Sequence, residues 1–202
     1  MVSQNTEIQR LALFGGAFDP VHMGHLMVAR YALKQVGLDR ILFIPSAQSP
    51  LKKSAPLVSD DERVEMLELA TSGEQRFRVD TFEVEEGGVS YSIETVKHFR
   101  AAYPNADLFW MIGADQFEQL DNWRDIDTLA GHLTFLVFGR TGSSLEPKVI
   151  EGLEYFEVDA PLMDTSSSQI RELCKNGGSI EGMVSEEVEA FISERGLYTV
   201  TK

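Results

Sequence analysis

The sequence predicts an α/β fold of the Rossmann-like, doubly wound kind, in which helices cover both faces of a mainly parallel sheet. Short apolar runs alternate along the chain with segments of helical periodicity, a pattern typical of parallel sheets. The run at residues 108–112 is almost purely apolar, as expected of a strand buried on both faces. The 202 residues, 43% of them hydrophobic, suffice for one good core, and no repeat or linker-like stretch divides them. We therefore expect a single domain over residues 1–202.

Apolar runs predict the strands of this sheet at residues 11–14, 41–45, 77–84, 108–112, 133–138 and 155–158. The run at 77–84 is assigned as a strand because its residues alternate. Helical patterns predict helices at residues 26–36, 59–69, 90–103, 169–174 and 185–194. Ser59 and Glu62 have the spacing of a capping box, which starts the helix at 59–69. Since ligands of parallel sheets bind beyond the carboxyl ends of the strands, we expect the loops that follow strands to converge there.

Charge and composition exclude several classes of protein. The net charge of −14 argues against a nucleic-acid-binding surface. Any positive field for an anionic ligand must then be concentrated at helix ends and a few cations. The single cysteine, Cys174, excludes an internal disulfide and fits a reducing compartment. Residues 1–10 lack the apolar core of a signal peptide, and no apolar run approaches the ~18 residues of a membrane span. We expect a cytoplasmic protein with no nucleic-acid or membrane partner.

The most informative stretch is residues 14–25, which read FGGAFDPVHMGH between a predicted strand and a predicted helix. Gly15 and Gly16 can adopt positive φ and let backbone N–H groups approach a ligand. The start of the following helix attracts phosphate. His22 and His25, three residues apart, project from one face of its first turn, and Gly24 leaves room beside the ring. A single histidine is more often a solvated side chain than a ligand, but the pair directly after a glycine turn favours an anion clamp.

Two other loops offer phosphate-binding groups, each with a simpler explanation. In the segment DTSSSQIR, Ser166 and Gln169 have the spacing of a helix cap, while further hydroxyls and Arg171 could bind phosphate. Lys52 and Lys53 lie on a proline-rich loop, where a solvated pair of cations is the simpler interpretation. Asp19, which precedes Pro20, is expected to be structural and to accept backbone N–H groups as a helix cap.

Two segments are suited to an aromatic ligand. Gly113-Ala114-Asp115 follows the apolar strand, and Trp123 comes eight residues after Asp115. Trp123 could belong to the core, or its face could stack on a flat electron-poor ring. Ser90-Tyr91-Ser92 starts a predicted helix, whose free N–H groups could face a carboxylate.

Together these segments resemble the nucleotidyltransferase superfamily that carries His-x-Gly-His, and within it the bacterial nicotinate-nucleotide adenylyltransferases. The resemblance extends over nearly the whole chain. Three positions depart from the family pattern: Ala17 replaces a Ser or Thr, Leu51 replaces the His of His-Lys, and Ser168 replaces Thr. The exchange at residue 168 keeps the hydroxyl, whereas Leu51 removes any contact made by the imidazole.

The resemblance implies transfer of adenylate from ATP to nicotinate mononucleotide, with the clamp and the aromatic side chain facing one shared cavity. Mg²⁺ would arrive with ATP, and no dedicated metal site is expected in the protein. The implied catalytic residues are His22, His25 and Arg171. The implied ATP-binding residues are Gly15, Gly16, Phe18, His22, His25, Lys52, Ser167, Ser168 and Arg171. The implied pyridine-nucleotide-binding residues are Gly15, Ala17, Tyr91, Ser92, Gly113, Asp115, Trp123 and Arg124.

Several alternatives stay open on the sequence. The first motif is shared by transferases that act on nicotinamide mononucleotide, phosphopantetheine or glycerol phosphate. A nucleotide-binding sensor without turnover could use the same fold. A helix N-terminus that faces the pyridine carboxylate would favour nicotinate over nicotinamide, because the amide carries no full charge. The sequence does not decide between a monomer and a homo-oligomer.

Overall fold

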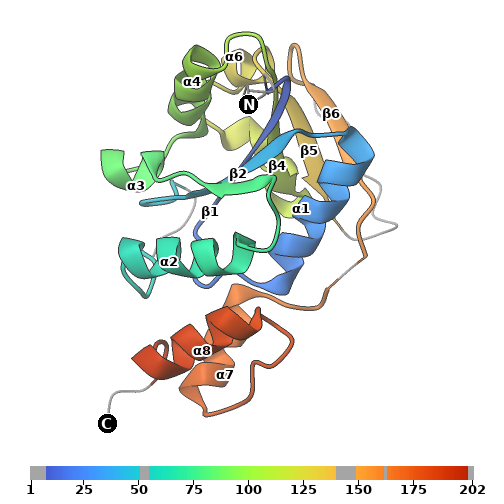
Figure 1. Ribbon diagram of the computed structural model, residues 1–202. Helices are drawn as coiled ribbons and strands as arrows, with labels where there is room; N and C mark the ends of the chain where they lie inside the picture. The colour runs from blue at the N-terminus through green and yellow to red at the C-terminus, as the bar shows by residue number, and fades with distance from the viewer. Residues whose placement is uncertain (1–7, 51–54, 140–148, 162, 200–202) are drawn as a thin grey trace, which may run out of the picture.

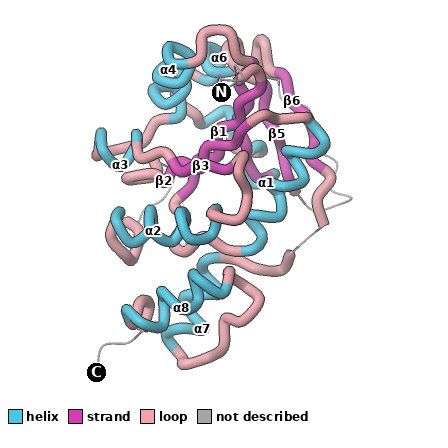
Figure 2. The backbone as a smooth tube through the Cα atoms, viewed as in Figure 1, coloured by secondary structure: helices cyan, strands magenta, loops and turns pink. Residues whose placement is uncertain are grey.

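The computed structural model describes residues 8–50, 55–139, 149–161 and 163–199. Its strands lie together in one sheet (Figure 2). Every neighbouring pair is parallel, and the order is β3-β2-β1-β4-β5-β6. The strands are β1 (Arg10–Gly16), β2 (Arg40–Pro45), β3 (Phe77–Val79), β4 (Asp107–Gly113), β5 (Thr134–Phe138) and β6 (Glu154–Val158). This confirms the expected doubly wound α/β fold. The strand order reverses between β1 and β4, the place where such sheets bind ligands.

Helices follow most strands, as the alternation of patterns predicts. The longer ones are α1 (Met23–Val36), α2 (Asp60–Thr71), α4 (Ser92–Ala102), α7 (Ser167–Lys175) and α8 (Glu186–Arg195). The shorter ones are α3 (Phe82–Glu86), α5 (Ala114–Phe117), a 3₁₀ helix (Leu120–Asn122) and α6 (Ile126–Ala130). Within the described ranges, no helix is long and apolar enough to cross a membrane.

Alternation along each strand divides the core into two layers. In β1, Ala12 and Phe14 face the layer that contains α1 and α2, whereas Leu11 and Leu13 face the layer that contains α4 and α6. All four side chains are buried, which explains the continuous apolar run at this strand. The helices α7 and α8 lie together at one end of the molecule, below α1 and α2 (Figure 1).

One predicted strand is wrong over most of its length. The run at 77–84 forms a strand only at Phe77–Val79 and then turns into the helix α3. Asp80 ends the strand, because its N–H still donates to the carbonyl of Phe43 while its carboxylate accepts from the N–H of Phe82. This local turn starts the helix, and alternation alone could not reveal it.

The start of the helix predicted at 90–103 is displaced by two residues. α4 begins at Ser92, because the Ser90 hydroxyl accepts a hydrogen bond from the N–H of Ala47, at 3.1 Å. The N–H of Ser90 in turn donates to the carbonyl of Gln48. These two bonds join the loop after β2 to the start of α4.

Candidate active site

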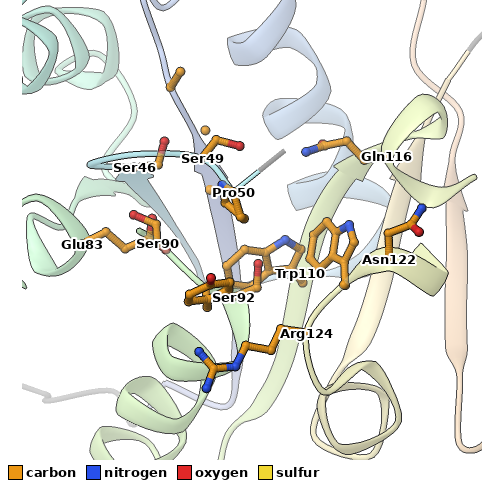
Figure 3. A pocket seen from close by; sticks show the side chains of 15 residues that line it. Ser46, Ser49, Pro50, Glu83, Ser90, Ser92, Trp110, Gln116, Asn122 and Arg124 are labelled. Carbon is orange, nitrogen blue, oxygen red and sulfur yellow. The ribbon is translucent and has the colours of Figure 1, made fainter. Parts of the chain in front are cut away.

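Two cavities lie at the carboxyl ends of the strands. The first, of about 270 Å³, we call the tryptophan cavity, and Figure 3 shows its lining. It is lined by Gly15, Gly16, Ala17, Ser46, Ser49, Pro50, Glu83, Ser90, Tyr91, Ser92, Trp110, Gln116, Asn122, Trp123 and Arg124. The second, of about 540 Å³, we call the histidine cavity. It is lined by His22, Gly24, His25, Val28, Gly113, Ala114, Asp115, Glu118, Phe138, Gly139, Ala160, Pro161, Met163 and Thr165.

In place of the single cavity expected, the structure has two adjoining cavities with a common wall. The short helix α5 contributes Asp115 to the histidine cavity and Gln116 to the tryptophan cavity, so it belongs to the walls of both. Because the chain turns into α5 directly after β4, the successive side chains of Asp115 and Gln116 point to different cavities. The order of the segments in the sequence does not reveal this division. Gly113 and Asp115 consequently line the histidine cavity, although the resemblance assigns them to the pyridine nucleotide.

His22 and His25 lie face to face at the start of α1, as their spacing predicts. Their ring centroids are 3.7 Å apart, and the backbone N–H of His22 donates to Nδ1 of His25, at 3.2 Å. Because Nδ1 of His25 accepts this bond, the proton of a neutral His25 must be on Nε2. His25 can then offer an N–H group to a phosphate oxygen. The ring of Phe18 packs edge-on against His25, with centroids 5.0 Å apart, which restricts its orientation.

His22 is a neutral group at pH 7. Burial lowers its pKa from 6.5 to about 4, because the charged imidazolium loses its hydration. Among the described residues, its Nδ1 atom is buried without a hydrogen-bond partner. The backbone N–H of Met23, which could have faced a phosphate, donates instead to the carbonyl of Met183, at 2.8 Å. The clamp therefore offers hydrogen-bonding groups, and its positive charge must come from other elements.

The glycines of the motif provide space rather than unusual backbone angles. Gly15 and Gly16 are absent from the described residues with positive φ, whereas Phe18 has a φ of 46°. A Cβ added to Gly15 would lie 3.0 Å from the ring of Trp110. One added to Gly24 would lie 3.0 Å from the ring of His22, which confirms the expected role of that glycine. The expectation of positive φ at the two glycines is wrong, because both still belong to the extended strand β1.

Arg171 connects α7 to the segment before His22. Its Nη1 atom donates to the main-chain carbonyl of Asp19 at 2.7 Å, and its Nη2 atom donates to the Ser168 hydroxyl at 3.1 Å. The Ser167 hydroxyl donates to the carbonyl of Pro20, at 2.9 Å. Two segments about 150 residues apart in the sequence thus meet next to the histidines, as the convergence of loops predicts. This arrangement places a guanidinium on the segment that leads into His22.

Asp19 is structural, as expected, but it is no helix cap. The N-cap residue of α1 is His22, and the Asp19 carboxylate accepts instead from the N–H of Leu57, at 2.9 Å. It also accepts from the hydroxyl of Tyr198, at 2.9 Å. Asp19 is 5% exposed, and these long-range donors provide the partners that a buried carboxylate requires.

The tryptophan cavity combines aromatic rings with the start of a helix. Trp123 lines it and packs edge-to-face on Trp110 and Phe135, each with centroids 6.3 Å away. Trp123 is therefore both a cavity-lining residue and a neighbour of the core. Tyr91 is the N-cap residue of α4 and makes no side-chain cap hydrogen bond. The guanidinium of Arg124 lies over the Tyr91 ring, 4.6 Å from its centroid. A cation therefore lies beside the start of this helix at Ser92 (Figure 3).

Comparison with known proteins identifies the family of this chain. Residues 13–173 match the model of the cytidylyltransferase-like family. A probable nicotinate-nucleotide adenylyltransferase of Opitutus terrae is 37% identical over 190 residues, which span 94% of this chain and 97% of the relative. One of Methylacidiphilum infernorum is 40% identical over 201 residues, covering 98% of this chain and 96% of the relative. This chain belongs to the nicotinate-nucleotide adenylyltransferase family.

Two solved structures share the fold. A Plasmodium falciparum nicotinic acid mononucleotide adenylyltransferase complexed with NaAD has a TM-score of 0.79 and 16% identity, covering 94% of this chain and 97% of its own. A putative nicotinate-nucleotide adenylyltransferase from Vibrio parahaemolyticus has a TM-score of 0.70 and 18% identity, covering 95% of this chain and 96% of its own. These likenesses confirm the Rossmann-like architecture of the family member described here.

Two residues of this family member escape sequence reasoning although they shape the site. Arg63, on α2, has no exposed surface and donates to the carbonyls of Ala17 at 2.6 Å and of Ser46 at 2.8 Å. It thereby fixes the loops that follow β1 and β2, both of which line the tryptophan cavity. Its partner Asp60 lies 2.5 Å from Nη2. The sequence does hold a signal for the burial of Arg63, because this residue lies on the apolar face of the capped helix together with other buried residues.

Glu83 is the second such residue. It is buried in the wall of the tryptophan cavity and accepts a hydrogen bond from the Thr95 hydroxyl, at 2.6 Å. Burial raises the pKa of its carboxyl, and hydrogen bonds from Thr95 and Ser90 oppose that rise. The assignment of 77–84 to a strand concealed this position. Lys52, the remaining cation of the expected site, lies outside the described residues.

Proposed function

We propose that residues 1–202 form a single nucleotidyltransferase domain that transfers the adenylyl group of ATP to nicotinate mononucleotide. The 5′-phosphate oxygen of the acceptor forms a bond to the α-phosphorus of ATP, and the bond from that phosphorus to the bridging oxygen breaks. The products are nicotinate adenine dinucleotide and pyrophosphate. The observation that carries the proposal is the pair of adjoining cavities at the β1–β4 switch point, one with paired imidazoles and one with tryptophans.

Positioning and electrostatics suffice for this reaction. The attacking phosphate is already ionised at neutral pH, so neither a protein base nor a covalent nucleophile is required. Alignment of two bound reactants can supply up to ~7–11 kcal/mol of the barrier. Preorganised donors then stabilise the charge that develops on the bridging oxygen and the leaving pyrophosphate.

The histidine cavity suits the phosphates at the reacting centre. In our proposal, Nε2–H of His25 donates to a phosphate oxygen, and neutral His22 adds a hydrogen-bonding group next to it. Arg171 and the hydroxyls of Ser167 and Ser168 bind the triphosphate, and Lys52 is a peripheral cation. A guanidinium suits this role because it remains charged and can contact two phosphate oxygens at once.

The tryptophan cavity suits the pyridine nucleotide. Trp123 offers a stacking surface, while the start of α4 at Ser92 offers N–H groups beside Arg124. A carboxylate gains more from these donors and this cation than a neutral amide does. The proposal therefore includes a preference for nicotinate over nicotinamide mononucleotide. Relatives that are named nicotinate-nucleotide adenylyltransferases, and the fold neighbour complexed with NaAD, support this choice.

Mg²⁺ enters the proposal as a companion of ATP. The described residues hold no group of three or more His, Cys, Asp or Glu side chains that could bind a metal ion. Imidazole and guanidinium donors fit phosphate oxygens, whereas Mg²⁺ prefers oxygen ligands and usually keeps most of them from phosphates and water. Bound in this way, Mg²⁺ would neutralise charge on the leaving pyrophosphate.

A comparison of acceptors tests the proposal. Pyrophosphate release from ATP would be measured with nicotinate mononucleotide, nicotinamide mononucleotide, phosphopantetheine and glycerol phosphate. We expect the highest kcat/KM with nicotinate mononucleotide. A higher value with another acceptor would reassign the substrate. If the protein binds ATP but releases no pyrophosphate with any of the four acceptors, it is instead a nucleotide sensor. We also infer a cytoplasmic location, supported by the single cysteine of the chain.

A further inference from the structure

The C-terminal turn of the chain reaches the phosphate-binding side of the site through one side chain. After α8 ends at Arg195, Gly196 adopts a left-handed conformation, with φ of 61°, and Tyr198 does so as well, with φ of 62°. A left-handed backbone is unfavourable for a residue with a side chain, so contacts of that side chain must compensate for it. The Tyr198 ring packs against the core, and its hydroxyl donates to Oδ1 of Asp19, at 2.9 Å.

Asp19 joins three parts of the chain. Its Oδ1 atom accepts from Tyr198, its Oδ2 atom accepts from the N–H of Leu57, and its main-chain carbonyl accepts from Arg171. The carboxylate is buried, and Asp19 lies three residues before His22 in the sequence. A buried negative charge requires strong partners, and each oxygen of this one already has a neutral donor.

Arg171 contacts the Asp19 carboxylate only loosely. Its Nη1 atom is 3.8 Å from Oδ2, well beyond the ~2.7–2.9 Å of a close charge-assisted hydrogen bond. The guanidinium donates its short hydrogen bonds to the Asp19 carbonyl and to the Ser168 hydroxyl. The arginine side chain keeps 27% of its surface exposed. This loose contact holds Arg171 beside the site and leaves part of its guanidinium open to a second anion.

We propose that Tyr198 is a positioning residue that keeps Arg171 available to the polyphosphate of ATP. Its hydroxyl occupies one oxygen of Asp19, so that the buried carboxylate does not draw the guanidinium into a closed ion pair. Without the hydroxyl, Oδ1 loses its donor, and the guanidinium of Arg171, 3.8 Å from Oδ2, can turn toward the carboxylate. The carboxylate then competes with ATP for the arginine. Burial and the neighbouring Asp19 raise the pKa of Tyr198, so its hydroxyl stays protonated and remains a donor at working pH.

This inference rests on the proposed function, and its test separates the two. The first measurement is binding of a non-hydrolysable ATP analogue to the unaltered protein, together with pyrophosphate release with nicotinate mononucleotide. If the unaltered protein shows neither binding of the analogue nor pyrophosphate release, the proposed function itself is wrong. With both present, Tyr198→Phe removes one oxygen and keeps the ring, and thermal unfolding followed by circular dichroism verifies that the variant is folded.

We expect Tyr198→Phe to reduce kcat/KM for ATP ~10-fold, the scale of one hydrogen bond to a charged group, and to weaken binding of the ATP analogue. The KM for nicotinate mononucleotide should stay within ~2-fold, because that ligand binds through the tryptophan cavity. Tyr31→Phe, on the exposed face of α1, is the matched control and should change neither value. A folded Tyr198→Phe protein with unchanged kcat/KM for ATP would overturn the inference.

A double-mutant cycle shows whether Tyr198 acts through Arg171. If it does, adding Tyr198→Phe to Arg171→Ala should cost no further activity. Full additivity of the two losses would overturn the inference, as would an equal effect of Tyr198→Phe on both substrates.

Asp19→Asn provides a second test of the inference if Tyr198→Phe does not fold, because it removes the competing charge and keeps an oxygen for the tyrosine. We expect it to raise the KM for ATP less than Arg171→Ala does, and an equal increase would contradict the inference.

Discussion

The backbone N–H of His22 donates to Nδ1 of His25, at 3.2 Å, and this bond fixes which nitrogen of His25 carries a proton. The donor on Nε2 is therefore set before any ligand arrives, and the ring contact with Phe18 restricts its direction. The bond joins the N-cap residue of α1 to the residue three positions later, so the helix start itself builds the clamp.

His25→Ala should lower kcat by ~10²–10³, the usual effect of removing one preorganised donor at a reacting centre. The variant should stay folded, although its unfolding temperature should fall somewhat because the N–H of His22 loses its acceptor, a loss on the scale of ~1 kcal/mol. The measurement is steady-state pyrophosphate release, beside circular dichroism of the same sample. His132→Ala, at an exposed site away from both cavities, should keep normal turnover. Normal turnover by His25→Ala would remove the histidine from the mechanism.

His22 should make the stability of the protein depend on pH between about 4 and 6.5, its folded and ordinary pKa values. Within that window the unfolded chain binds the imidazole proton and the folded chain does not, so stability decreases as the pH falls. His22→Gln should flatten this part of a curve of unfolding temperature against pH, whereas His132→Gln should not. Identical slopes for the unaltered protein and His22→Gln would show that burial does not hold His22 neutral.

Gly24→Ala should separate stability from activity. An alanine inside a helix ordinarily stabilises it by ~1 kcal/mol relative to glycine, but a Cβ here would lie 3.0 Å from the His22 ring. Displacement of that ring should lower kcat ~10-fold or more, since misplacement by 1 Å can cost 10²-fold. The unfolding temperature should not fall in parallel. Gly73→Ala, where an added Cβ would meet nothing within 4 Å, is the control. Full activity of Gly24→Ala would mean that the position of His22 is unimportant.

Trp123→Ala should raise the KM for nicotinate mononucleotide ~10-fold or more, because stacking of a base on an aromatic ring contributes ~1–3 kcal/mol. The KM for ATP should change by less than ~2-fold, since the histidine cavity is not lined by this residue. Initial rates with each substrate varied in turn give both constants. If the KM for the pyridine nucleotide stays constant while the unfolding temperature falls, Trp123 is a core residue and no ligand platform.

Local spacing in the sequence sufficed for much of the site. The three-residue interval between His22 and His25 places both rings on one helix turn, and Ser59 with Glu62 forms the expected cap. Residues 80–84 show the limit of such reasoning, because a hydrogen bond from the N–H of Phe82 to the side chain of Asp80 turns the chain where alternation predicted a longer strand. Gly15 lines the tryptophan cavity in an extended conformation, and a side chain is excluded there because an added Cβ would lie 3.0 Å from Trp110 on a neighbouring strand.

The sequence by itself determined the chemistry of the loops and the alternation of strands and helices along the chain, because both depend on residue types and on short intervals. The order of the strands within the sheet came from the structure. Only the tertiary structure decided where Arg63 and Glu83 lie, which cavity Asp115 lines, and that Tyr198 meets Asp19 across 179 positions of sequence. It also decided that His22 is neutral, because the hydration of an imidazole depends on everything packed around it. Burial and long-range contact are properties of the folded chain, and no local pattern encodes them.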